Sequence, residues 1–248
     1  MATNGQAPPD PTPPAGEETS ATQPKPVMTP EVIEFLVVMG FAFVPSLIVS
    51  MAFWLMPTPV ERPTGLLAYQ YVLKIFEMCL PLLYIVWRND GSWKSLGLVK
   101  PKWSDIFWGI LLFLSAYLAY YAVAIAFRAL LPQPPVHEES WRAALPHLRS
   151  AWDYPGILCL SLAVGFGEEL LFRGFIISRW HRLSGSVGQA IAVSALLFGI
   201  NHVYQGAMGI LSAAILGCVY AAGFSKLRRL WPTAIAHAMT DFIALSLQ

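Results

Sequence analysis

The chain has 248 residues, of which 56% are hydrophobic and only 12% are charged. A soluble domain usually carries roughly 25% charged residues, so the positive mean hydropathy of +0.53 excludes an ordinary soluble protein. The formal net charge of +1 provides no basic field for nucleic acid, and we therefore expect no nucleic-acid partner.

The first 30 residues are predicted to form a disordered, Pro-rich tail. They contain eight of the 20 prolines and almost no large apolar side chains. Such a segment buries too little apolar surface to offset the entropy lost on ordering. It also lacks a basic start followed directly by an apolar core, so we do not interpret it as a signal peptide.

Apolar segments of membrane-spanning length then recur to the end of the chain, each near the ~20 residues that a ~30 Å hydrocarbon core requires. Because they are continuous and not alternating, helices that satisfy their own backbone explain them better than strands. The predicted fold is an all-α polytopic transmembrane bundle over residues 31–248, with about seven spanning helices. An eighth, re-entrant element near residues 140–149 is the alternative. The seven segments are residues 32–56, 66–87, 106–131, 156–178, 187–203, 207–227 and 231–247.

The basic residues predict an orientation for this bundle. With the amino terminus inside, ten Lys and Arg residues fall in inner segments and four in outer loops, which favours amino terminus inside and carboxyl terminus outside. The inner set is Lys25, Arg88, Lys94, Lys100, Lys102, Arg179, Arg182, Lys226, Arg228 and Arg229, and the outer set is Arg62, Arg128, Arg142 and Arg149.

Three charged residues lie inside the fourth segment, where each costs roughly 2.5–3.5 kcal/mol on insertion scales. Glu169 and Arg173 are separated by four residues, so they share a helix face and are predicted to form an ion pair. Glu168 points about 100° away from that face and has no charged partner on its own helix. A carboxylate of this kind is suited to proton transfer. The alternative is that both glutamates lock helices together in a salt-bridge network.

Two later segments carry further ionisable residues. His202 lies late in the fifth segment, and His237 and Asp241 are four residues apart in the seventh. Each could be a satisfied structural residue when taken alone. Together with Glu168 they provide four proton-transferring or metal-binding groups from three neighbouring helices, which is typical of a site for catalysis or ion handling.

These residues resemble the signature of the CPBP intramembrane metalloprotease family, which includes the CAAX prenyl endopeptidases and the bacterial Abi and bacteriocin-processing proteins. The family motifs EExxxR, FxxxH and HxxxN or HxxxD appear in order as Glu168-Glu169-Leu-Leu-Phe-Arg173, Phe198-Gly-Ile-Asn-His202 and His237-Ala-Met-Thr-Asp241. The resemblance covers about residues 155–245, and the first 150 residues match only as generic spanning helices.

The resemblance implies a role for each matched residue. Glu168 and His202 would activate a water molecule, and His237 with Asp241 would bind the oxyanion or help to hold a metal. Glu169 and Arg173 would support the site. Close relatives of the prenyl endopeptidases usually carry Asn at the position of Asp241, and an ionised aspartate cannot donate to an oxyanion.

Asp241 would therefore be protonated, bind metal or orient His237. Zn²⁺ could be held by Glu168, His202, His237 and Asp241. The chain has no HExxH motif, however, and a metal-free glutamate mechanism uses the same residues.

The sequence thus predicts an integral, multi-pass membrane protein, in a bacterial inner or plasma membrane in preference to the endoplasmic reticulum. Its partners would be the lipid bilayer and a membrane-associated protein or peptide that it cleaves as an intramembrane endopeptidase. A prenylated protein is one candidate substrate. Two other functions stay open: a non-catalytic immunity or scaffold protein, and an ion or proton transporter, for which no inverted repeat of broken helices is visible.

Overall fold

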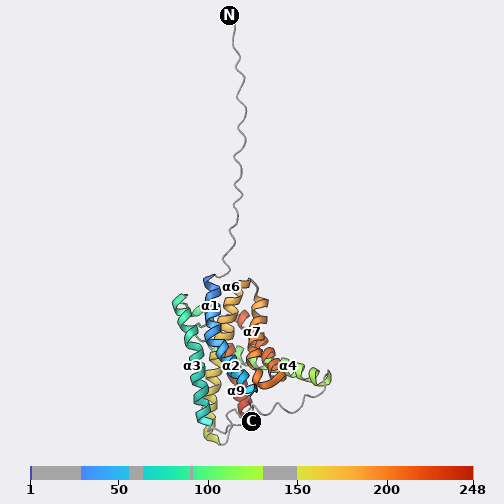
Figure 1. The fold of residues 1–248 in the computed structure, drawn as a ribbon. Helices are drawn as coiled ribbons and strands as arrows, with labels where there is room; N and C mark the ends of the chain where they lie inside the picture. The colour runs from blue at the N-terminus through green and yellow to red at the C-terminus, as the bar shows by residue number, and fades with distance from the viewer. Residues whose placement is uncertain (2–28, 56–63, 90–91, 131–149, 248) are drawn as a thin grey trace.

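The computed structural model describes residues 1, 29–55, 64–89, 92–130 and 150–247 (Figure 1). The predicted tail lies almost wholly outside the described residues, and the proposed re-entrant element at residues 140–149 lies entirely outside them. The described residues form helices and no β-strand. The predicted all-α bundle is therefore confirmed.

In the described residues the helical segments join into seven continuous helices, which correspond one to one with the seven predicted segments. They are α1 (Pro30–Val38) with η1 (Met39–Phe43) and α2 (Val44–Leu55), then α3 (Thr64–Asn89), α4 (Trp103–Leu130), α5 (Tyr154–Glu169) with η6 (Leu170–Ile177) and α6 (Ser178–Ser184), α7 (Val187–Asn201), α8 (Gly206–Leu227) and α9 (Leu230–Ser246). Three short 3-10 turns connect or precede them, namely η2 (Trp93–Leu96), η5 (Ala151–Asp153) and η7 (Val203–Gln205). The first helix begins at Pro30, two residues earlier than its apolar run suggests, because the side chain of Thr29 caps it.

Four helices in the described part of the chain are long and apolar enough to cross a membrane, namely Pro30–Ala52, Trp103–Ala126, Ala151–Ser184 and Val203–Leu227. Large apolar side chains on their outer faces are exposed, including Phe41 and Leu118. A soluble protein rarely leaves so much apolar surface in contact with water. The chain is thus an integral membrane protein.

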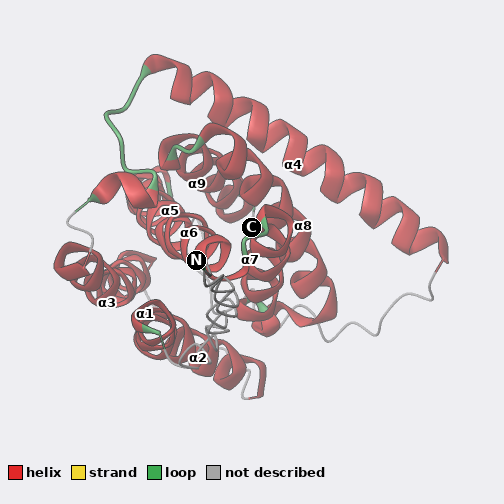
Figure 2. Ribbon diagram, turned by 90° about the horizontal axis from the view of Figure 1, so that it is seen from above, coloured by secondary structure: helices red, strands yellow, loops and turns green. Residues whose placement is uncertain are grey.

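The fourth helix lies at the centre of the bundle (Figure 2). In the view from above, α1, α2 and α3 lie on one side of α5 and α6, and α4, α8 and α9 lie on the other. The middle part of the fourth helix is η6, a π-helix in which all eight residues are buried. Single turns of π-helix occur frequently at functional sites, and this one directly follows Glu168 and Glu169.

Glycines let the neighbouring helices approach the centre closely. A Cβ atom on Gly165 of α5 would lie only 2.7 Å from the backbone nitrogen of Ala238 in α9. A Cβ atom on Gly199 of α7 would lie 2.8 Å from the carbonyl oxygen of Ile210 in α8. Small residues at helix crossings permit such backbone contact in membranes.

The fifth helix is short, and this sets the depth of the candidate site. α7 has 15 residues, which gives a length of about 22 Å, whereas the hydrocarbon core is about 30 Å thick. The chain therefore turns inside the bundle, through η7 and through Gly206, whose φ of 75° favours glycine. His202 lies at the end of α7.

Candidate active site

The centre of the candidate site is a buried ion pair that extends to a histidine. Arg173 Nη1 lies 2.7 Å from Glu169 Oε1, and both side chains are fully buried. The predicted pairing of these two residues is confirmed. The same oxygen lies 2.9 Å from His237 Nδ1. Because a carboxylate oxygen accepts, the Nδ1–H group of His237 must donate, and Nε2 then faces the remaining groups of the site.

Glu168 lies on the other side of the His237 ring. Its Oε2 atom is 3.9 Å from His237 Nε2. Glu168 has no charged partner on its own helix, and His237 on α9 is the ionisable residue that faces it. This oxygen is buried and accepts no hydrogen bond from the described residues. A buried carboxylate oxygen with unused acceptor capacity is available to a water molecule or a substrate.

Asp241 lies one turn further along α9 and shares a helix face with His237. Its Oδ2 atom is 3.6 Å from His237 Nε2. The side chain of Asp241 is 26% exposed and that of Glu168 14%, whereas Glu169 and Arg173 are 0% exposed. The candidate site is therefore accessible from the side of Glu168 and Asp241.

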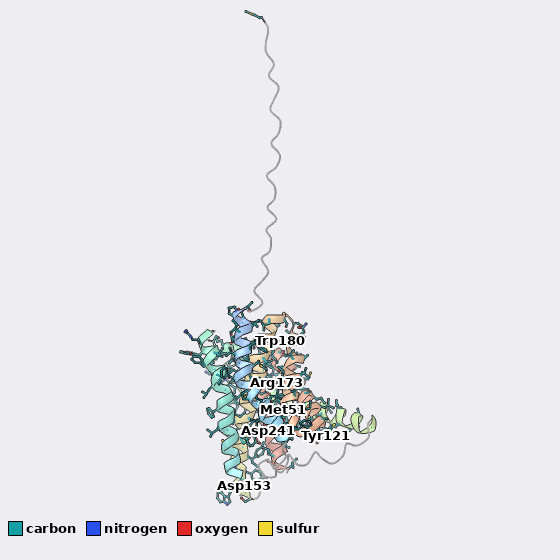
Figure 3. The ribbon with its side chains drawn as sticks, in the orientation of Figure 1. Met51, Tyr121, Asp153, Arg173, Trp180 and Asp241 are labelled. Atoms are coloured by element: carbon teal, nitrogen blue, oxygen red, sulfur yellow. The ribbon has the colours of Figure 1, made fainter. Side chains whose placement is uncertain are left out.

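In the side-chain view, Arg173 and Asp241 lie between the levels of Trp180 and Asp153 (Figure 3). Trp180 is near one end of the fourth helix and Asp153 directly precedes its other end. The ionisable cluster thus lies in the middle of the bundle and not at either of its ends.

His202 joins the cluster from the end of α7. Its Nδ1 atom lies 2.8 Å from the carbonyl oxygen of Phe198. Because a carbonyl oxygen only accepts, we assign the proton of a neutral His202 to Nδ1, which leaves the Nε2 lone pair free to accept a proton. The rings of His202 and His237 both lie against the ring of Phe198, so His202 lies beside the cluster.

Phe198 is the aromatic residue around which the cluster packs. The guanidinium carbon of Arg173 lies 4.4 Å from the centre of the Phe198 ring. The ring centres of His202 and His237 lie 4.7 Å and 5.6 Å from the same ring. Sequence reasoning gave Phe198 no role beyond its place in a motif. The fixed FxxxH spacing, which puts Phe198 one helical turn before His202, was the signal that could have identified it.

Zn²⁺ was one of the two alternatives that the sequence left open for this site. A structural or catalytic zinc needs three or four protein ligands around one point. Among the described residues, no three His, Cys, Asp or Glu side chains form a group that could hold a metal ion. The Nδ1 atom of His237 is also occupied by Glu169. Glu168 can activate a water molecule without a metal.

The fold and these contacts define a polytopic helical membrane protein with a cluster of proton-transferring groups in its core. Residues 149–243 match the family model described as type II CAAX prenyl endopeptidase Rce1-like. The match covers the three motifs and supports their resemblance to the CPBP or CAAX protease family. No curated protein and no solved structure matches the chain significantly.

Proposed function

We propose that the chain is a glutamate-dependent intramembrane endopeptidase that cleaves a membrane-associated protein or peptide. A prenylated carboxyl terminus is the first substrate class to test, because the matched family model carries that description. The single observation that carries the proposal is the position of Glu168. Its buried Oε2 atom, on α5, lies 3.9 Å from Nε2 of His237 on α9. This oxygen accepts no hydrogen bond from the described residues.

Glu168 would act as the general base. It takes one proton from a water molecule while the water oxygen forms a bond to the scissile carbonyl carbon. The neutral His202 accepts a hydrogen bond from the same water at Nε2. Protonated Glu168 then delivers its proton to the leaving nitrogen as the C–N bond breaks, which regenerates the carboxylate. General acid–base catalysis of this kind contributes roughly 10²–10⁴-fold to the rate.

His237 would stabilise the oxyanion that forms in this step. In its protonated form it donates from Nδ1 to Glu169 and from Nε2 toward the reacting centre. Asp241, 3.6 Å from Nε2, orients the ring and compensates its charge. This assignment removes the difficulty that an ionised aspartate cannot itself donate to an oxyanion. Preorganised donors of this type are worth about 10²–10³-fold.

The test is cleavage of prenylated and unprenylated reporter peptides by purified protein in proteoliposomes. Glu168→Gln keeps the shape of the side chain and removes its basicity, so we expect cleavage to fall by about 10²-fold or more. Cys159→Ser is the matched control, because Cys159 is exposed on the same helix. Full cleavage by Glu168→Gln would overturn the proposal and favour a non-catalytic role for the cluster.

A further inference from the structure

Ser50 in α2 connects the first helix to the turn that carries His202. Its hydroxyl donates to the carbonyl oxygen of Asn201 at 2.6 Å and accepts from the backbone N–H of Tyr204 at 3.3 Å. Asn201 directly precedes His202, and Tyr204 follows it by two residues. A single buried hydroxyl therefore holds the backbone on both sides of the histidine.

The carbonyl group of Asn201 is one that a helix end leaves without a donor inside its own helix, because Asn201 is the last residue of α7. A backbone polar group left unpaired in hydrocarbon costs several kcal/mol. Ser50 satisfies one acceptor and one donor at the same point, while its own side chain is almost fully buried.

The ring of His202 depends on this backbone. Tyr204 stacks on it with ring centres 5.9 Å apart and an interplanar angle of 30°. On its other side His202 bonds to Phe198, within α7. The direction of Nε2 is thus fixed by the end of α7 and by the turn, and both are held by Ser50.

We propose that Ser50 is a positioning residue for His202, so that the first helix is part of the catalytic apparatus. This inference rests on the proposed function. Ser50 lies outside residues 149–243, the region that matches the family model, and no motif marks it. The prediction is that the family-matched region does not form a complete active site without the hydroxyl from α2.

The experiment compares Ser50→Ala with Ser50→Thr, which keeps the hydroxyl. Displacing a catalytic group by about 1 Å costs on the order of 10²-fold. We therefore expect Ser50→Ala to lower kcat by about 10- to 100-fold with little change in KM, and Ser50→Thr to restore most of the rate. If the alanine variant does not fold, Ser50→Val replaces it, because valine has the shape of threonine without the hydroxyl.

The matched control is Ser194→Ala. Ser194 is also buried and its hydroxyl also links two helices, donating to the carbonyl oxygen of Phe172 at 2.8 Å. It has no hydrogen bond to residues 201–204. We expect this variant to lose stability but to keep its kcat. Equal losses of kcat in Ser50→Ala and Ser194→Ala, or an unchanged kcat in Ser50→Ala, would overturn the proposal.

A second measurement does not depend on cleavage. Nitrogen NMR of ¹⁵N-histidine-labelled protein reports the tautomer and hydrogen bonding of His202, whose signal is identified by its loss in His202→Ala. Ser50→Ala should shift or broaden this signal, whereas Ser194→Ala should not. An unaltered His202 signal overturns the positioning role. An altered signal combined with full cleavage by Glu168→Gln supports the positioning role and overturns the proposed function, so the two failures are distinguishable.

Discussion

His237 Nδ1 lies 2.9 Å from the same carboxylate oxygen of Glu169 that Arg173 contacts at 2.7 Å. The Glu169 carboxylate therefore pairs with a buried guanidinium and, through the same oxygen, accepts a hydrogen bond from a histidine on another helix. The second glutamate of the first motif acts on the histidine of the last motif, and the two motifs form one unit. Metal-binding and catalytic histidines are commonly oriented by a hydrogen bond from one ring nitrogen to a carboxylate or a backbone carbonyl group. Glu169 orients His237 in the same way.

The first prediction concerns this buried pair. Glu169→Gln leaves Arg173 buried without a compensating charge, and breaking a buried pair in this way costs about 3–5 kcal/mol. We expect a large fall in the temperature of unfolding in detergent, together with a loss of cleavage. Thermal unfolding and initial rates on the same preparation measure both effects.

The double variant Glu169→Gln with Arg173→Met separates stability from catalysis. It removes both charges, and replacing a buried pair by apolar groups is often neutral or stabilising, so much of the lost stability should return. Cleavage should stay low, because a neutral glutamine amide does not stabilise the protonated form of His237 as the Glu169 carboxylate does. Recovery of full cleavage in the double variant would show that the contact between Glu169 and His237 does not matter.

The second prediction concerns the contact between α5 and α9. In Gly165→Ala the new methyl group would lie 2.7 Å from the nitrogen and 3.0 Å from the Cα atom of Ala238. Backbone atoms cannot rotate away, so the helices must separate and carry Glu168 away from His237. We expect at least about 10-fold lower kcat, since small misplacements are costly.

Gly188→Ala provides the control for this prediction. Gly188 is also helical, but a Cβ atom there meets nothing closer than the Ser186 hydroxyl at 3.9 Å. Alanine is favoured over glycine in helices by about 1 kcal/mol, so this variant should be as stable as the wild type or more stable and fully active. If Gly165→Ala cleaves as fast as Gly188→Ala, close packing of α5 on α9 is not needed for the reaction.

The third prediction concerns Asp241, where close relatives of the prenyl endopeptidases usually carry asparagine. If Asp241 orients His237, then asparagine retains a carbonyl oxygen that can accept from Nε2, and leucine does not. We expect Asp241→Asn to keep a substantial fraction of the rate and Asp241→Leu to lose about 10²-fold, comparable with loss of an oxyanion donor. Steady-state kcat for the two nearly isosteric variants checks this, and equal rates in both would contradict it.

Much of the fold was predictable because lipid imposes a simple rule. Each helix in a membrane must be apolar and near a fixed length, so seven segments could be marked from hydropathy, and all seven are helices. The pairing of Glu169 with Arg173 was also predictable, because it depends only on spacing along one helix. Both predictions depend only on the length of one segment or on the spacing of residues within it.

The contacts between helices could not be predicted in this way. No pattern in the sequence shows that Glu169 reaches His237, because that contact depends on how α5 packs against α9. The helix α7 ends at Asn201, two residues before the end of the predicted segment at residue 203, since residues 202 and 203 are as compatible with a longer helix as with a turn. Ser50 is an unremarkable serine in an apolar run, and only its position beside the 201–204 backbone reveals it.

The last prediction concerns metal dependence. No three acidic, histidine or cysteine side chains in the described residues form a group that could hold a metal ion. Glu168 can activate water by itself. We therefore expect prolonged treatment with 1,10-phenanthroline and EDTA to leave cleavage unchanged. The treated protein should also unfold at the same temperature as the untreated protein, because a bound structural or catalytic metal stabilises the folded state.

Metal analysis of the purified protein makes this prediction sharper. A zinc enzyme would contain about one zinc per chain, and His202→Ala or His237→Ala would reduce that content, because histidine is a usual zinc ligand. A glutamate enzyme would contain no stoichiometric metal, and the same two variants would lose cleavage without any change in metal content. Loss of activity on chelation that added Zn²⁺ restores would require the four side chains to rearrange around the ion, and would replace the general-base mechanism with a metal-assisted one.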